Sequence, residues 1–267
     1  MIRMRRILHA ICLSALAASA PAQNPPVQKI RASKVILVGD STTAVIGGWG
    51  PSFCADHVTS FLACMNLARG GRSSGNYMTE GSWDLALAEM STRGYQNIWV
   101  LIQFGHNDQP GKPGRSTDLA TEFPRNLRRY VTEARQAGAK PILVTPLTRR
   151  IFKDGKLDND LAPWAKAIRR IAAEMNVPLV DLNARSFAVV QALGDTASQR
   201  FAQLPKGSLP VGPAAPGTTE VLVQPAAAPK LSFDHTHLGS HGADFFATIV
   251  AAGLLEAVPE MRPLLLP

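Results

Sequence analysis

Residues 34–42 read KVILVGDST, a continuous apolar run that passes directly into a glycine and three small polar residues. An apolar run of this length is typical of a strand that is buried on both faces, as in a parallel sheet covered by helices. Three further runs have the same character, and a fourth is weaker. They are NIWVLIQFG (97–105), KPILVTP (140–146), VPLVDLN (177–183) and, as the weaker candidate, FLACMNLA (61–68).

Amphipathic stretches lie between and after these runs and predict helices. The expected helices cover about 82–93, 119–137, 158–175 and 243–258. Strands that alternate with helices of this length form βαβ units, in which helices cover both faces of the sheet. The sequence therefore predicts an α/β protein: a three-layer α/β/α sandwich around a central, mostly five-stranded parallel sheet.

The first 22 residues have the pattern of a secretory signal peptide, which predicts a secreted or periplasmic protein. Three arginines precede an apolar run from Ile7 to Ala18, and small residues close the segment. The run is too short to span a bilayer as a helix, so we expect no membrane association after its removal. Residues 23–267 would form a single domain, which we expect to be monomeric. Within it, a Pro- and Ala-rich stretch at about 203–230 has no helical period and is interpreted as an insertion.

The net charge bears on which classes of molecule the protein could bind, and the cysteines bear on the compartment in which it folds. The chain has 28 lysines and arginines against 20 aspartates and glutamates, a formal net charge of +8 at pH 7. The arginines occur in scattered pairs such as 128–129 and 149–150, which we interpret as surface charge, and we expect no nucleic-acid binding. Cys54 and Cys64 predict a disulfide in an oxidising compartment, with two buried free thiols as the alternative.

Small polar turns follow three of the predicted strands and indicate one shared site. They are GDST (39–42), ARGGRSS (68–74) and GHND (105–108), and a fourth polar segment, DHTH (234–237), precedes the last helix. A single turn of this kind would be interpreted as a helix cap. The carboxyl ends of parallel strands, however, meet at one edge of the sheet, where ligands of such folds bind. The four segments would therefore bring a serine hydroxyl, amide donors and a histidine with a carboxylate together.

With these four segments in this order, the chain resembles the SGNH (GDSL) hydrolase superfamily. ARGGRSS, GHND and DHTH are similar to the rhamnogalacturonan acetylesterase branch. The resemblance implies a flavodoxin-like SGNH fold and a secreted serine esterase that needs no metal and no cofactor. Its substrate would be an acetylated plant cell-wall polysaccharide or oligosaccharide, such as rhamnogalacturonan or another pectin, from which it removes O-acetyl groups. The stretch 203–230 departs from the family pattern, which leaves the substrate range open.

The resemblance also implies a role for each matching residue. Ser41 would be the nucleophile, and Asp234 and His237 would complete the catalytic triad. The backbone amides of Ser41 and Gly71 and the side chain of Asn107 would form the oxyanion hole. These roles fit ester hydrolysis, because a serine hydroxyl needs a base and the base needs an orienting carboxylate.

Other side chains of these segments allow more than one interpretation. Arg72 and His235 are candidates for substrate binding, and Arg72 could meet the carboxylate of a uronic acid, although an arginine exposed to solvent is the commoner outcome. The imidazoles of His235, His237 and His241 also have a spacing seen in zinc sites. Only one imidazole is needed for a triad, so His241 is interpreted as a surface or capping residue. His106 is expected to pack inside or to support its turn.

Two other functions stay open at this point. The same chemistry could act on acetylated xylan, on lipid esters or on aryl esters. The chain could also be a catalytically silent glycan-binding protein that keeps the fold. The complete set of serine, asparagine, aspartate and histidine argues against the silent protein.

Overall fold

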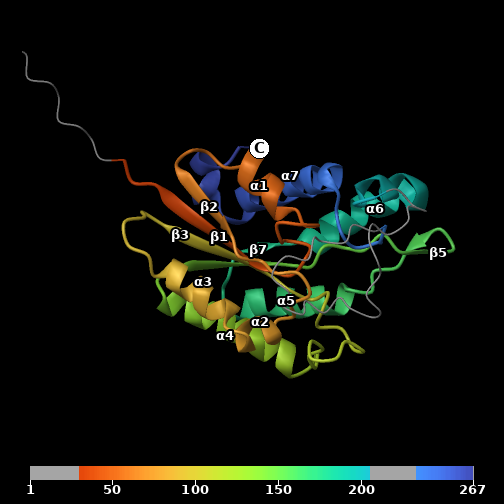
Figure 1. Cartoon of the computed structure of the whole chain (residues 1–267), viewed down its shortest axis with the longest axis horizontal. Coiled ribbons are helices and arrows are strands. Elements are labelled where there is room, and N and C mark those ends of the chain that lie inside the picture. Colours follow the sequence, from red (N-terminus) through yellow and green to blue (C-terminus); the bar gives the residue numbers. More distant parts are fainter. Residues whose placement is uncertain (1–29, 205–232, 267) are drawn as a thin grey trace, which may run out of the picture. The chain divides into compact units, whose positions relative to one another are not determined.

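The computed structural model describes residues 30–204 and 233–266 (Figure 1). The predicted signal peptide and nearly all of the stretch 203–230 lie outside the described residues. All described helices and strands belong to one compact unit that begins at Arg31. No helix in these two ranges combines the length and the apolar character that spanning a bilayer requires.

Five parallel strands form the central sheet, as predicted. Their order across the sheet is β2-β1-β3-β4-β7, and every neighbouring pair is parallel. Every residue of β1 and β3 is buried, which explains the apolar runs 35–38 and 98–102 within them. The strands are β1 (Ser33–Gly39), β2 (Leu62–Asn66), β3 (Ile98–Gln103), β4 (Lys140–Val144) and β7 (Leu179–Val180).

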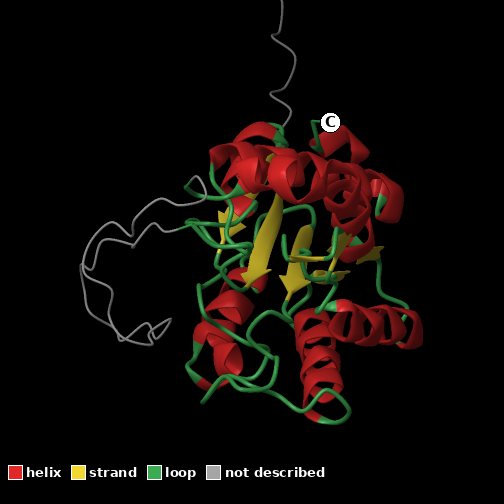
Figure 2. Cartoon of the chain, turned by 90° about the vertical axis from the view of Figure 1, so that its right-hand side faces the viewer, coloured by secondary structure: helices red, strands yellow, loops and turns green. Residues whose placement is uncertain are grey.

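Helices cover both faces of this sheet and complete the three layers (Figures 1 and 2). One layer contains α1 (Gly50–Asp56), α6 (Leu182–Ser198) and α7 (Ser240–Ala257). The short 3₁₀ helices η1 (Gln199–Phe201) and η2 (Pro259–Leu264) lie beside α7. The other layer contains α2 (Asn76–Thr79), α3 (Ser82–Met90), α4 (Glu122–Gln136) and α5 (Ala162–Glu174).

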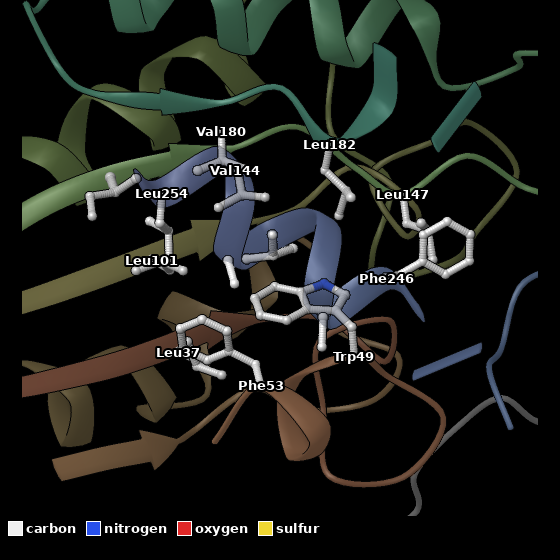
Figure 3. Packing of buried hydrophobic residues seen from close by; sticks show 14 of the residues in the cluster. Leu37, Trp49, Phe53, Leu101, Val144, Leu147, Val180, Leu182, Phe246 and Leu254 are labelled. Atoms are coloured by element: carbon white, nitrogen blue, oxygen red, sulfur yellow. The ribbon is translucent and has the colours of Figure 1, made fainter. Parts of the chain in front are cut away.

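Two apolar clusters, one on each face of the sheet, hold the layers together. Successive residues of β1 alternate between them, because side chains on a strand point to opposite faces. Leu37 belongs to the first cluster, together with Trp49, Phe53 and Leu254 (Figure 3). Ile36 and Val38 belong to the second cluster, on the side of α3, α4 and α5.

The structure corrects the prediction of a strand over 177–183. Strand β7 covers only two residues, because Asp181 ends it and begins α6. The Asp181 carboxylate accepts hydrogen bonds from the backbone N–H of Ala184 at 3.3 Å and from the Thr145 hydroxyl at 2.9 Å. An aspartate in this position caps the first turn of a helix. Helices α1 and α6 and the short hairpin of β5 (Phe152–Lys153) and β6 (Lys156–Leu157) were not predicted.

A disulfide joins Cys54 in α1 to Cys64 in β2, which confirms the predicted pair. It fastens a helix of one layer to an edge strand of the sheet. The two cysteines are separated by 10 positions, and closing a loop of this size stabilises the fold by about 3 kcal/mol in the chain-entropy model.

Candidate active site

Ser41 lies in the turn that follows β1, at the carboxyl edge of the sheet. Asp40 holds this turn: its Oδ1 accepts hydrogen bonds from the backbone N–H of Thr42 at 2.9 Å and from the Thr42 hydroxyl at 2.8 Å. Its Oδ2 lies 3.2 Å from Nδ1 of His106, and both side chains are buried. Burial works to raise the pKa of Asp40, but His106 and the hydrogen bonds from Thr42 outweigh it and lower this pKa. His106 therefore supports the turn from inside.

His237 connects Ser41 to Asp234. Its Nε2 lies 2.8 Å from Oγ of Ser41, and its Nδ1 lies 2.7 Å from Oδ2 of Asp234. Oδ1 of Asp234 accepts two backbone N–H groups, from Thr236 at 2.7 Å and from His237 at 2.6 Å. Burial works to raise the pKa of Asp234, but the hydrogen bonds and the charge of His237 outweigh it and lower the pKa to about 2. Asp234 is therefore ionised at neutral pH and fixes the ring that faces Ser41.

The turn that contains Gly71 and the loop that contains Asn107 lie next to Ser41. A Cβ added to Gly70 would lie 3.6 Å from Cβ of Ser41, and Gly71 has a φ of 77°, in the region that favours glycine. Asn107 donates from Nδ2 to the carbonyl of Arg72 at 3.0 Å. This bond uses one of the two hydrogens on Nδ2. The structure thus brings Ser41, Gly71 and Asn107 to one edge, while their role as an oxyanion hole stays a prediction.

Asp108 connects the loops on this side of the site. Its carboxylate accepts hydrogen bonds from the backbone N–H of Ser74 at 3.0 Å, the Ser74 hydroxyl at 2.6 Å and the Thr117 hydroxyl at 2.8 Å. The hydroxyl of Tyr130 donates to the carbonyl of Ser74 at 2.9 Å. Burial raises the pKa of Asp108 to about 6, although the hydrogen bonds from Ser74 and Thr117 lower it.

The raised pKa of Asp108 predicts a pH dependence of stability. The folded chain holds this proton more tightly than the unfolded chain, so the contribution to the free energy of unfolding is largest at low pH. It is lost as the pH rises from about 4 to about 6. A rise of this pKa from 3.8 to about 6 corresponds to a contribution of about 3 kcal/mol to the free energy of unfolding. Asp108→Asn should remove this contribution, so that the free energy of unfolding changes less with pH between pH 4 and pH 6.

Urea unfolding of the wild type and of Asp108→Asn at several values between pH 4 and pH 7 measures this effect. The lowered pKa of Asp234 acts below pH 4, because its contribution is lost as the pH falls toward about 2. The two groups therefore act in separate pH ranges. Parallel stability curves for the two proteins between pH 4 and pH 7 would contradict the assignment to Asp108.

Arg72 and His235, the two candidates for substrate binding, each contact other side chains of the protein. Nε of Arg72 donates to both carboxylate oxygens of Glu80, at 3.0 and 2.9 Å, which holds its guanidinium. His235 lies edge-on against Phe233, and its Nδ1 is 3.5 Å from the side-chain nitrogen of Gln199. Substrate binding by Arg72 and His235 stays a prediction.

The three histidines near the end of the chain do not converge. His241 is exposed, and its ring lies near Phe201, whereas His237 contacts Ser41. In the part of the chain that the structure describes, no group of three or more His, Cys, Asp or Glu side chains is placed to hold a metal ion. The three histidines therefore have the spacing of a zinc site in the sequence, but of His237 and His241 only His237 faces Ser41.

The interpretation of Arg149 and Arg150 as surface charge was wrong. Both are buried, and both donate hydrogen bonds to the segment 234–237. Their position is the sequence signal for this role, because the pair follows a predicted strand at its carboxyl end, where ligands of such folds bind.

Comparisons with known proteins agree with this arrangement. The model of the GDSL-like Lipase/Acylhydrolase family matches residues 37–243. The chain is 30% identical over 232 residues to the probable rhamnogalacturonan acetylesterase YesY of Bacillus subtilis (strain 168), covering 84% of this chain and 94% of that protein. It is 32% identical over 234 residues to the rhamnogalacturonan acetylesterase RhgT of the same organism, covering 84% and 90%.

Solved structures show the same fold. The acetylxylan esterase Axe2 of Geobacillus stearothermophilus superposes with a TM-score of 0.54 at 18% identity, over 86% of this chain and 96% of that one. The protein YXIM of Bacillus subtilis superposes with a TM-score of 0.62 at 21% identity, over 86% of this chain and 58% of that one. At these identities the likeness concerns the three-layer architecture.

Proposed function

The chain belongs to the GDSL-like lipase/acylhydrolase family, and on this premise we propose that it is a serine carbohydrate esterase that removes O-acetyl groups from rhamnogalacturonan. The observation that carries the proposal is the hydrogen-bonded series from Ser41 through His237 to Asp234. The carbohydrate substrate is proposed because two relatives that match along most of their length are named as rhamnogalacturonan acetylesterases.

The side chains suit an acyl-enzyme mechanism. Oγ of Ser41 attacks the acetyl carbonyl while Nε2 of His237, 2.8 Å away, takes the hydroxyl proton. His237 then gives this proton to the sugar oxygen as the bond between that oxygen and the acetyl carbon breaks, which leaves acetyl-Ser41 and a free sugar hydroxyl. Water, deprotonated by the same nitrogen, attacks the acetyl carbon, and His237 returns the proton to Oγ of Ser41 as the bond to Ser41 breaks and acetate leaves. Asp234 stays ionised throughout and stabilises the positive charge on the ring.

The negative oxygen of the tetrahedral intermediate needs donors that are already in place. In this proposal the backbone amides of Ser41 and Gly71 and the second hydrogen on Nδ2 of Asn107 supply them. The bond from Asn107 to the carbonyl of Arg72 fixes the orientation of the amide before substrate binds. Donors fixed in advance lower the barrier more than mobile donors do, because no reorganisation is needed during the reaction.

Asn107→Ala should lower kcat by roughly 10²- to 10³-fold with a much smaller change in KM, because the lost donor acts on the transition state. Steady-state kinetics with p-nitrophenyl acetate measures both constants. Asn159→Ala is a matched control, since the Asn159 side chain donates to Asn183 rather than to the Ser41 region. A change confined to KM would make Asn107 an ordinary binding group.

The substrate class is tested by acetate release. Rhamnogalacturonan-rich acetylated pectin should release acetate faster than acetylated xylan does, and faster than a lipid ester releases its fatty acid. Chemically deacetylated samples should release none. Faster release from xylan or lipid would assign the chain to another substrate class of the same chemistry. If none of these esters nor p-nitrophenyl acetate is cleaved, the proposed esterase activity is wrong, and binding of the same polysaccharides would test the alternative of a catalytically silent glycan-binding protein.

We also propose that the chain is exported. Its first 22 residues have the signal-peptide pattern, and the disulfide between Cys54 and Cys64 is of a kind that persists in oxidising compartments. Mass spectrometry of the protein recovered from a bacterial host should give the mass of a chain shortened by about 22 residues. A full-length mass in the secreted fraction would contradict the proposed cleavage.

A further inference from the structure

Arg150 binds every carbonyl of the segment 234–237, which carries Asp234 and His237. Its backbone N–H donates to the carbonyl of His235 at 2.8 Å. Its guanidinium donates from one terminal nitrogen to the carbonyls of Asp234 and His237, both at 2.9 Å. The other terminal nitrogen donates to the carbonyl of Thr236 at 3.5 Å. One arginine thus holds four successive peptide groups.

The segment has little other regular structure to hold it. Residues 233–237 are neither helix nor strand, and α7 begins only at Ser240. The next anchor along the chain is Leu238, whose backbone N–H donates to the carbonyl of Gly47 at 2.9 Å. Within the segment, the Asp234 carboxylate accepts the N–H groups of Thr236 and His237, whereas Arg150 holds the carbonyls. The direction in which the Asp234 and His237 side chains leave the backbone therefore depends in large part on Arg150.

Arg150 is itself fixed from several sides. Its carbonyl accepts a hydrogen bond from the side chain of Gln199 at 3.2 Å. The neighbouring Arg149 donates from Nε to the Thr236 hydroxyl at 3.2 Å and pairs with Asp160 in front of α5. The two arginines therefore connect the segment 234–237 to η1 and to the loop that precedes α5.

Stability alone does not explain why a charged arginine occupies this buried position. Its exposed fraction is 1%, and burial lowers its pKa to about 10, so it stays charged at neutral pH. Among the described residues its guanidinium donates to carbonyl oxygens and forms no ion pair, and its Nε has no hydrogen-bond partner. Apolar side chains of similar volume would stabilise a core at least as well as a buried charge held in this way.

We propose that Arg150 is the positioning residue of the site: by holding the four carbonyls, it keeps Nε2 of His237 within hydrogen-bond distance of Oγ of Ser41. The inference rests on the proposed catalytic roles of Ser41 and His237. A guanidinium suits this role because its donors are spread over three nitrogens and reach several carbonyls at once. The donors of a lysine ammonium all lie on one nitrogen.

Arg150→Ala should lower kcat about 100-fold, the effect of moving a reacting group by about 1 Å, while KM changes less than about threefold. Arg150→Lys should lose less, because it keeps the charge and some donors. Adding millimolar guanidinium ion should restore part of the kcat of Arg150→Ala. The matched control is Arg169→Ala: Arg169 donates to both carboxylate oxygens of Asp181 at 2.7 and 2.9 Å, so its loss should leave kcat unchanged and show no rescue.

The rate at which a fluorophosphonate labels Ser41 separates this inference from the proposed function. If the wild type is neither labelled at Ser41 nor active, the proposed function itself fails. If the wild type is labelled and Arg150→Ala is labelled equally fast with kcat unchanged, the proposed function stands and the positioning role is overturned. Circular dichroism and thermal melting give the folded fraction of each variant. A loss of kcat in Arg150→Lys that equals its unfolded fraction would overturn the inference as well.

Discussion

Ser41→Ala is expected to abolish ester hydrolysis while leaving the fold nearly unchanged. The change removes the oxygen that lies 2.8 Å from Nε2 of His237, and without it no acyl-enzyme can form. The turn itself should persist, because Asp40 and Thr42 make the hydrogen bonds that hold it. Acetate release and p-nitrophenyl acetate hydrolysis measure the loss, and the melting temperature measures the fold.

A second serine provides the control for this variant. Ser52 lies in α1, where it is half-buried and its hydroxyl donates to Asp244 at 2.7 Å. Ser52→Ala should keep wild-type turnover and remain reactive toward a fluorophosphonate at Ser41. Substantial turnover by purified Ser41→Ala, with the control also active, would show that another group is the nucleophile.

The sheet and the turns at its carboxyl edge could be predicted because the local sequence determines them. Residues 35–38 of β1 and 98–102 of β3 are buried and apolar without interruption. Asp40 follows β1 and Gln103 ends β3, so a polar residue marks the end of each apolar run. The three-residue spacing of Asp234 and His237 permits both their backbone and their side-chain contact, since the carboxylate accepts from the N–H and faces the ring of the same histidine.

Other features could not be predicted because their cause lies elsewhere in the fold. Helix α6 is interrupted at Gly194, which has a φ of 76° and a ψ of 173°, so its apolar residues do not follow one helical period. The role of Arg150 depends on carbonyls that lie 84 to 87 positions further along the chain. Backbone carbonyls are present at every residue, and no sequence pattern indicates which of them a buried arginine will meet.

The three histidines of the segment 235–241 offer the sharpest test of the site, because each has different surroundings. His237 uses one ring nitrogen toward Ser41 and the other toward Asp234. His235 lies against Phe233, and His241 is exposed beside Phe201. Only one of the three rings is therefore placed to carry a proton to and from the substrate, although all three have a spacing compatible with zinc.

His237→Ala should lower kcat by about 10⁴-fold or more, because the serine loses its base and the departing sugar loses its acid. His235→Ala should cost far less, and His241→Ala almost nothing, as steady-state kinetics of the three purified variants would show. Prolonged treatment of the wild type with EDTA should leave it active, since each step of the proposed reaction is carried by Ser41, His237 and Asp234. If chelation removes the activity and zinc restores it, or if all three variants lose activity equally, the histidines act together on a metal ion and the triad is wrong.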